Sequence, residues 1–420
     1  MNFIKEITIK NFFSIKNEVT LNLQASEYTK QQHPYRLFHC NNEYINKLTV
    51  LYGANASGKT TILKALVLVS HIISNKREDF PISHKNIYNS SRNTSFIEIV
   101  FVFENKEFTY KIDFLSEKHL IVGIKDEVLK IKNNNTYLIL INRKQKIFKD
   151  FNNKQIDNIL FDKVSTKKSL LVESITRISD YDNLLNFFSN IPFLTNIKGS
   201  HHVSMHLENE DNIMLASAFS DKEDTSLPFS EQILKIDKQK FYKFMFPILK
   251  ELGIDIDIAK SNIDLNKTNN KDEFRIEVEF LITHSVNKNK KLDFHFESSG
   301  TKMLFKILFD IYYAYKTKSV LIIDELDSML HPMIVPIINL LTIKNDIQLI
   351  YSTHNIHNMK YLYSDEIFLI KKDNNHITEI DNLTKDYKGY ENFEKLYRNK
   401  QLGAIPKLEN ISLDMLVIDK

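Results

Sequence analysis

The length, composition and charge of this chain are those of an ordinary globular protein: 420 residues, 43% hydrophobic and 26% charged, enough for two or three lobes. A formal net charge of +3 is too small to predict nucleic-acid binding by itself. The single cysteine, Cys40, excludes an internal disulfide and a thiolate metal site, which suits a reducing cytoplasm. No run of 18 apolar residues exists, so we expect no membrane partner.

The first 150 residues are expected to form strands around one helix. Alternating patterns over 3–12 and 18–23 predict two strands joined by a short turn. The apolar run 45–53 predicts a buried strand that ends in a loop, and 59–75 has helical spacing. A hairpin is predicted over 95–115, with further strands to about residue 150. Together these strands predict an antiparallel layer beside the buried strand.

The middle of the chain predicts a helical insertion over residues 151–285. Helical patterns at 169–178, 182–191 and 240–253 are separated by polar, Asn-rich loops. Heptads are not sustained anywhere in this part, so long coiled-coil arms are not expected.

After about residue 290 the pattern becomes regular again. A helix follows Gly300, an apolar strand covers 319–326, and a helix follows Pro332. Two more apolar strands are predicted at 347–355 and 366–372. Because strands alternate with helices here, the sequence predicts a parallel sheet and an α/β fold.

A phosphate-binding loop is predicted at "GANASGKT", between the apolar strand and the helix. Glycine is scarce in the chain, with eight in all, yet two lie five residues apart here. Glycines let backbone amides surround a phosphate at the positive end of a helix. The pattern G-x-x-x-x-G-K-[ST] assigns Lys59 to the β- and γ-phosphates and the Thr60 hydroxyl to Mg²⁺. The residues predicted to bind nucleotide here are Gly53, Ala54, Asn55, Ala56, Ser57, Gly58, Lys59, Thr60 and Thr61.

A second motif, "VLIIDELDSMLHP", has the form of a Walker B strand. Asp324 is expected to hold Mg²⁺, and Glu325 is expected to polarise the attacking water as general base. By itself an acidic pair at the end of a buried strand is only a cap, but the phosphate-binding loop upstream favours the functional interpretation. Asp327 could equally cap the following helix.

Two other groups of residues are interpreted as structural. His201, His202 and His206 have no carboxylate or cysteine spaced to complete a metal site, so a polar loop is favoured. Asp180 and Asp182 invite a nuclease interpretation, but they lie in a helical pattern with no apolar strand before them. We therefore interpret these aspartates as surface acids.

Five segments and the tail resemble one family of ATPases. The segments are "ITIKNFFSIKNEVTLNL", "YGANASGKTTILKAL", "ESSGTKMLFKIL", "VLIIDELDSMLHP" and "QLIYSTHN", and the tail is "LYRNKQLGAIPKL". They resemble the bacterial ABC/AAA-type ATPases of the OLD and abortive-infection group, which are relatives of the RecF and SMC proteins without long arms. The resemblance covers residues 1–150 and 290–410.

The resemblance implies an ABC-type P-loop NTPase head. Its core would be a mixed and parallel β-sheet with an antiparallel β layer, and it would carry the helical insertion. The N-terminal lobe would be 1–150, the insertion 151–285 and the C-terminal lobe 286–420.

The resemblance also implies a homodimer that sandwiches ATP and Mg²⁺. Ser298, Ser299 and Gly300, which alone would be a good N-cap, would be the signature that completes the partner's γ-phosphate site. His354 would be the switch histidine that contacts the γ-phosphate, although a strand-end histidine can also be merely structural. With Lys59 and Glu325 it completes the predicted catalytic set.

The chain departs from the family in several places. Phe13 stands where many relatives have a basic residue, His331 replaces the D-loop aspartate of transporter ATPases, and no Q-loop glutamine is evident. The chain ends soon after Gly403, which leaves no room for a Toprim nuclease domain, so any nuclease is expected on a separate partner.

The sequence therefore leaves several functions open. One is a phage-defence ATPase whose ATP-clamped dimer controls a separate effector, a nuclease or another toxic protein. Another is a RecF-like repair ATPase that clamps DNA, so nucleic acid is retained as a candidate partner. A nucleotide-gated scaffold is disfavoured by Glu325, and a transport ATPase by the D-loop.

Overall fold

The computed structural model describes most of the chain in two compact units. The described residues are 2–40, 42–73, 94–117, 120–134, 136–155, 169, 179–194, 238–254, 256–267, 274–284, 287–293, 296–373, 377–387, 392–402 and 404. Unit 1 comprises Met1–Ser189 and Ile350–Lys420, and unit 2 comprises Asn190–Leu349. The contacts thus divide the chain into two units, whereas the sequence predicts three consecutive segments.

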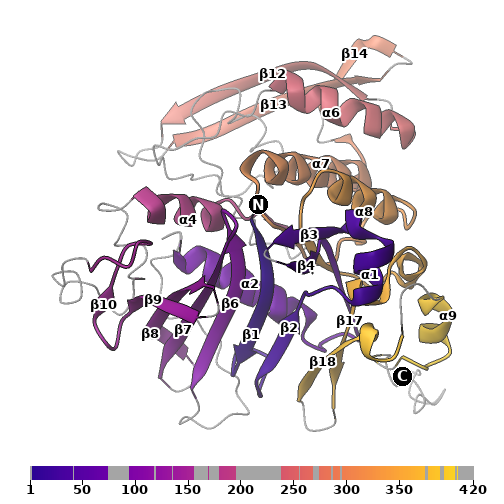
Figure 1. Cartoon of the computed structure of the whole chain (residues 1–420). Coiled ribbons are helices and arrows are strands. Elements are labelled where there is room, and N and C mark those ends of the chain that lie inside the picture. The colour runs from indigo at the N-terminus through magenta and orange to yellow at the C-terminus, as the bar shows by residue number, and fades with distance from the viewer. Residues whose placement is uncertain are drawn as a thin grey trace, which may run out of the picture. The chain divides into compact units, whose positions relative to one another are not determined.

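A seven-stranded antiparallel sheet forms much of unit 1 (Figure 1). Its order is β10-β9-β8-β7-β6-β1-β2, with the bounds β1 Phe3–Lys10, β2 Val19–Asn22, β6 Ser95–Phe103, β7 Lys106–Glu117, β8 Leu120–Asn133, β9 Thr136–Asn142 and β10 Ile147–Phe148. The predicted hairpin is confirmed, because Phe103 pairs with Lys106 across Glu104 and Asn105, whose φ angles are +50° and +63°. Two consecutive residues with positive φ form a hairpin turn whose twist matches the right-handed twist of the two strands.

A second group of strands in unit 1 carries the phosphate-binding loop. Its order is β16-β5-β17-β18, with the bounds β16 Leu349–Ser352, β5 Leu48–Tyr52, β17 Ile367–Lys372 and β18 Thr378–Asn382. β17 is parallel to β5 and antiparallel to β18. Every residue of β5 is buried, as a strand covered on both faces requires.

Helix α2 (Lys59–Ile73) begins directly after that loop, as predicted. It packs against β1 and β6 and against α4 (Ser179–Ser189). The Ser70 hydroxyl donates to the carbonyl of Phe188 at 2.6 Å, which ties α2 to α4. A helix covered on several sides must be apolar nearly all round, and the segment from Ile62 to Val69 is.

Short elements of unit 1 were not predicted from the sequence. They are α1 Glu27–Gln32, η1 Pro34–Arg36, β3 Leu37–Cys40, β4 Glu43–Asn46, η4 Ile356–Tyr361, η5 Ser364–Glu366, η6 Leu383–Lys385 and α9 Phe393–Arg398. A buried bidentate ion pair joins two of them, because Arg36 Nε and Nη2 donate to Glu366 at 2.7 and 2.8 Å. This pair connects η1 to η5 across 330 residues of sequence.

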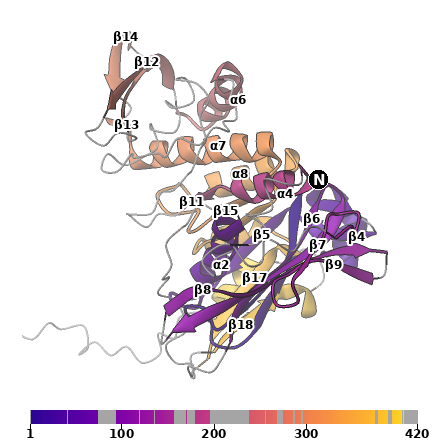
Figure 2. The same cartoon turned by 90° about the vertical axis from the view of Figure 1, so that its left-hand side faces the viewer.

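Unit 2 combines helices with a small antiparallel sheet. Its elements are β11 Phe193–Leu194, α6 Lys238–Glu251, β12 Ile256–Lys267, β13 Phe274–His284, β14 Asn287–Asp293, α7 Ser299–Thr317, β15 Leu321–Ile323 and α8 Ile334–Lys344. β11 is parallel to β15, and β12, β13 and β14 form a three-stranded sheet. Figure 2 shows α6 alongside this sheet and α7, and the Phe241 ring on α6 contacts Phe305, Phe309 and Tyr312 on α7.

The prediction for residues 151–285 needs correction in part. Helices α4 and α6 are where helical patterns were predicted. Residues 256–284, however, contain the long strands β12 and β13, so the segment is not purely helical.

Several predictions lie outside the described residues. They concern the helix at 169–178 apart from Ser169, the histidines 201, 202 and 206, and Gly403. Within the described ranges, no helix combines the length and the hydropathy needed to cross a bilayer.

Candidate functional site

The predicted phosphate-binding loop runs from the end of β5 to the start of α2 and needs glycine at both ends. A Cβ atom at Gly53 would lie 2.3 Å from the carbonyl oxygen of Ile370 on β17, closer than a Cβ can approach. Gly58 has φ +119°, a conformation that side chains disfavour, and its Cβ would crowd Thr378 at 3.2 Å. Both positions therefore require glycine for a physical reason.

The Lys59 side chain folds back over the loop. Its Nζ donates to the carbonyl oxygens of Gly53 at 2.9 Å and Ala54 at 3.1 Å, and the residue is buried. Three donors on one ammonium can bridge loop carbonyls and phosphate oxygens. The predicted phosphate-binding lysine is thus held at the start of the loop.

Ser57 contributes a buried polar atom to the loop. The Ser57 hydroxyl is buried and makes no hydrogen bond with the described residues. Buried hydroxyls are nearly always satisfied, so an unpartnered one inside a loop of this kind fits a bound phosphate. The position of the loop at the N-terminus of a 15-residue helix adds the favourable helix dipole.

The two threonines after Lys59 have different surroundings. The Thr61 hydroxyl is buried and bonded to the Ser14 hydroxyl at 2.7 Å. Thr60, in contrast, is half-buried. The role of Thr60 as magnesium ligand stays a prediction, whereas Thr61 ties the helix to the turn after β1.

The turn after β1, residues 12–15, lies against the P-loop and the start of α2. Phe12 and Ile15 exchange two backbone hydrogen bonds of 2.9 Å, and Phe13 between them has φ +46°. The Phe13 ring, at the position where the resemblance predicts a basic side chain, lies under the Lys64 ammonium at 5.4 Å. A positive charge is thus present beside Phe13, supplied by α2.

Residues far away in the sequence cover the loop from the other side. The Thr378 hydroxyl donates to the carbonyl of Ser57 at 3.2 Å, and Lys372 Nζ donates to that of Ala56 at 3.4 Å. Ala56 itself has φ +61°. No motif marks Thr378 or Lys372, so sequence reasoning missed them, and only the pairing of β17 with β5 brings them here.

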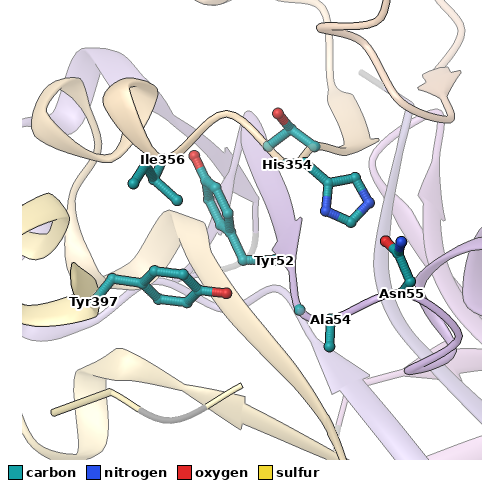
Figure 3. Close-up of a pocket in the computed structure, with 8 residues that line it drawn as sticks. Tyr52, Ala54, Asn55, His354, Ile356 and Tyr397 are labelled. Atoms are coloured by element: carbon teal, nitrogen blue, oxygen red, sulfur yellow. The ribbon is translucent and has the colours of Figure 1, made fainter. Parts of the chain in front are cut away.

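His354 lies in a cavity that begins at the phosphate-binding loop (Figure 3). The cavity has a volume of about 500 Å³. In Figure 3, the exposed His354 ring and Asn55 lie at one end, and the Tyr52 and Tyr397 rings lie at the other. The full lining is Tyr52, Gly53, Ala54, Asn55, Thr353, His354, Ile356 and Tyr397. The structure thus brings the predicted switch histidine to the first residues of the loop.

The predicted signature residues lie in unit 2 at the start of α7. Ser298 is the N-cap of this helix, and its hydroxyl accepts from the amide of Thr301 at 3.1 Å. Ser298 and Ser299 are exposed. A Cβ at Gly300 would lie 2.8 Å from the carbonyl oxygen of Met329, so the start of α7 packs closely on the loop after β15.

The predicted Walker B residues follow β15 in the same unit. Asp324 is 3% exposed, whereas Glu325 is exposed and adopts φ +54°. Asp327 does not cap α8, because the N-cap is Met333 and has no side-chain hydrogen bond. His331 is exposed, and its Nδ1 accepts from the Met333 amide at 3.3 Å.

A buried acid on α7 was not singled out from the sequence. Asp310 is 1% exposed, and burial raises its pKa to about 7, although Lys306 partly opposes the shift. One of its carboxylate oxygens, Oδ2, has no hydrogen-bond partner in the described residues. Asp310 lies among the apolar residues of a helical pattern, and only the structure reveals that its Oδ2 is buried without a hydrogen-bond partner in the described residues.

The acidic pair Asp180 and Asp182 lies on α4, as the helical pattern predicted. Asp182 is not the surface acid that was expected, because it is half-buried and its Oδ1 has no hydrogen-bond partner in the described residues. The described residues contain no group of three or more His, Cys, Asp or Glu side chains arranged to hold a metal.

The glycine-bounded loop between a buried strand and a helix, with its lysine folded inward, defines a P-loop nucleotide-binding protein. Residues 48–358 match the family described as "AAA domain, putative AbiEii toxin, Type IV TA system". Because the match covers more than half of the chain, the protein belongs to this family of AAA proteins. The family match supports the resemblance to ABC/AAA-type ATPases but does not distinguish the OLD group.

Two solved structures align with most of the chain. One is an SMC head bound to the C-winged helix domain of ScpA, with 14% identity over 92% of this chain and 100% of that one, at a TM-score of 0.44. The other is the SMC head domain from Thermotoga maritima, with 13% identity over 90% and 98% of the two chains, at a TM-score of 0.41. No protein with a curated description matches the sequence.

Proposed function

We propose that the protein is an ATPase whose ATP-clamped homodimer controls a separate toxic effector in defence against phage. The observation that carries the ATPase part is the cavity that His354 shares with the first residues of the P-loop. The defence part is supported by the family description, which names a putative toxin of a toxin–antitoxin system. In this proposal nucleotide binding changes the association of two subunits, and the effector responds to that change.

The residues of unit 1 would bind and sense the triphosphate. Lys59, now bonded to the carbonyls of Gly53 and Ala54, would give its donors to the β- and γ-phosphate oxygens. The buried Ser57 hydroxyl would gain the partner it lacks within the described residues. His354 would donate to the γ-phosphate from its exposed position in the cavity.

Magnesium and the water-activating base are assigned on the motifs. The Thr60 hydroxyl and the Asp324 carboxylate have the oxygen ligands that Mg²⁺ prefers. When bound, Mg²⁺ would neutralise charge on the phosphates. Glu325, exposed after the buried Asp324, would take the proton of the attacking water.

The proposal that Ser298 acts on a second subunit is supported by its exposure. Ser298 and Ser299 are exposed, and they open a 19-residue helix whose positive end favours an anion. Two copies related by a two-fold axis would each supply this helix start to the other's phosphate site.

ATP turnover by the purified protein tests the proposal. We expect phosphate release by the native protein and background rates for Lys59→Ala and Glu325→Gln. Lys125→Ala, which changes an exposed lysine on β8, should retain the native rate and serves as the matched control. Absence of both ATP binding and turnover in the native protein would contradict the proposal.

The defence role needs a separate test in cells. We expect protection against phage from the intact locus, and loss of protection with Lys59→Ala at equal protein levels. If protection is absent and the ATP-bound protein instead binds duplex DNA in a salt-sensitive way, the RecF-like alternative replaces it.

A further inference from the structure

Helix α9 packs against the segment that follows His354. The 3₁₀ segment η4 (Ile356–Tyr361) begins two residues after His354, and α9 (Phe393–Arg398) packs against it. Both elements belong to unit 1, as does the P-loop. Tyr397 of α9 also lines the cavity that contains His354. The helix is therefore close enough to affect the position of the histidine.

A three-residue ionic cluster joins α9 to η4. Glu394 Oε1 lies 2.9 Å from His357 Nδ1 and 3.0 Å from Arg398 Nη2. Arg398 Nη2 in turn lies 3.4 Å from His357 Nε2. The His357 ring thus has the carboxylate at one nitrogen and the guanidinium at the other.

These partners define which nitrogen of His357 carries the proton. A guanidinium can only donate, so in the neutral ring Nε2 accepts from Arg398, and Nδ1 carries the proton that is donated to Glu394. Because each ring nitrogen has a different partner, the ring has one preferred orientation. The side chains of His357 and Arg398 are 57% and 50% exposed, so the cluster adds to the packing of α9 on η4 rather than holding η4 alone.

The same loop is held from inside by buried tyrosines. Asn358 is fully buried, and its Nδ2 donates to the Tyr351 hydroxyl at 2.6 Å. The hydroxyl of Tyr52, the residue before Gly53, donates to the carbonyl of Asn355 at 3.3 Å. The Asn355 side chain accepts from the amide of His357 at 3.1 Å. His354 thus lies on a loop held on one side by the P-loop strand and on the other by α9.

We infer that α9 is a clamp that sets the position of His354, with Glu394 and Arg398 as positioning residues for the γ-phosphate contact. The inference rests on the proposed function of His354. The Tyr397 hydroxyl of α9 donates to the carbonyl of Ala404 at 3.0 Å, so α9 is itself bonded to the chain that follows it. A change at Ala404 that moved α9 would then alter how the protein distinguishes ATP from ADP.

The test uses Glu394→Ala and Arg398→Ala in the full-length protein. For both we expect the turnover number to fall about tenfold, because a small displacement of a phosphate contact is costly to rate. The affinity for a non-hydrolysable ATP analogue should fall about fivefold or more, while ADP affinity stays within about twofold, because ADP has no γ-phosphate.

Two controls separate positioning from general damage. Lys395→Ala changes an exposed residue of the same helix and should leave all three quantities unchanged. Glu394→Gln keeps an oxygen that can accept from His357 Nδ1, so it should retain most of the native discrimination. If either alanine variant melts at a lower temperature than the native protein, Arg398→Lys replaces it. Lysine keeps the charge but lacks the planar fork that reaches both Glu394 and His357, so Arg398→Lys should lose discrimination while melting like the native protein.

A double variant tests whether the clamp acts through His354. Adding Glu394→Ala to His354→Ala should lower discrimination no further, because both changes remove the same contact. Native discrimination in both alanine variants, an equal loss of ADP affinity, or full additivity with His354→Ala would overturn the inference. If the native protein itself does not prefer the analogue over ADP, the proposed function is contradicted, and the inference that rests on it falls too.

Discussion

The P-loop of unit 1 and the helix start of unit 2 are both predicted to bind phosphate, but they are built differently. The P-loop is buried at both glycines, its lysine is held by the carbonyls of Gly53 and Ala54, and its backbone accepts hydrogen bonds from side chains of β17 and β18. The helix start at Ser298 and Ser299 is exposed, and the Ser298 side chain caps its own helix.

This difference indicates how binding would be shared between two subunits. A preorganised, partly desolvated loop can bind an anion with contacts from its own unit. An exposed helix start offers a dipole and two hydroxyls but little burial, so it contributes only when another surface excludes water around it. We therefore expect substitutions in the P-loop to affect nucleotide binding, and those at Ser298 to affect turnover.

The largest expected effect is that of Gly53→Ala on nucleotide binding. The added Cβ would lie 2.3 Å from the Ile370 carbonyl, so the start of the loop must move. We expect ATP affinity to fall about 100-fold or more, measured by calorimetry. Gly253→Ala in unit 2 also strains the backbone, at φ +75°, but its Cβ meets nothing within 4 Å, so it controls for general destabilisation and should leave ATP affinity unchanged. Native affinity in Gly53→Ala would show that the loop geometry does not determine binding.

Substitution of Ser298 should separate the two regions. Asparagine is also a good N-cap, so Ser298→Asn should keep the stability of α7, whereas Ser298→Ala should lose about 1 kcal/mol. In both variants we expect ATP turnover to fall about 30-fold while ATP affinity of the monomer is retained. Turnover that follows stability, with Ser298→Asn fully active, would reduce Ser298 to a cap.

The next largest expected effect is that of pH on protein stability, through Asp310 on α7. Burial raises the pKa of Asp310 to about 7 from an ordinary 3.8, so the folded protein holds a proton that the unfolded chain has released between those pH values. Stability should therefore fall as pH rises from 4 to 7, by up to about 4 kcal/mol. Asp310→Asn should remove this slope in chemical denaturation.

An exposed acid of the same unit provides the control for that experiment. Asp346→Asn makes the same substitution at an exposed position and serves as the matched comparison. A slope that persists in Asp310→Asn would assign the pH dependence to other groups.

The smallest expected effect distinguishes the adjacent threonines of the P-loop. Thr61→Val removes the hydrogen bond to Ser14 and should cost about 1 kcal/mol of stability with near-native turnover. Thr60→Val should instead abolish magnesium-dependent turnover while the melting temperature stays the same. The opposite pattern would exchange the roles of the two residues.

Much of the P-loop region could be predicted from the sequence because its signals are local. The buried strand, the glycine spacing, the lysine and the following helix are contiguous, and the alternation of β6 and β7 is regular. The approach of His354 to the loop was also predicted, because a motif placed it at the end of the strand β16.

The rest could not be predicted, for two physical reasons. Strand β12 has a register shift between Ile258 and Lys260, which obscures its two-residue period, although β13 alternates regularly from Phe274 to Phe280. Partners such as Thr378 over Ser57, or Glu394 beside His357, are brought together only by the fold. A single sequence contains no local signal for such distant contacts.

The measurement that tests the central claim most directly is the molar mass of Glu325→Gln in solution, with and without ATP and Mg²⁺. Removing the base should stop turnover and leave the bound state to accumulate. We predict a monomer without nucleotide and twice that mass with ATP, with the increase lost when Ser298→Asn is added. A molar mass that does not change with ATP would contradict the ATP-dependent dimer. An ATP-dependent dimer that still forms when Ser298→Asn is added would contradict the role of Ser298 in the partner's phosphate site.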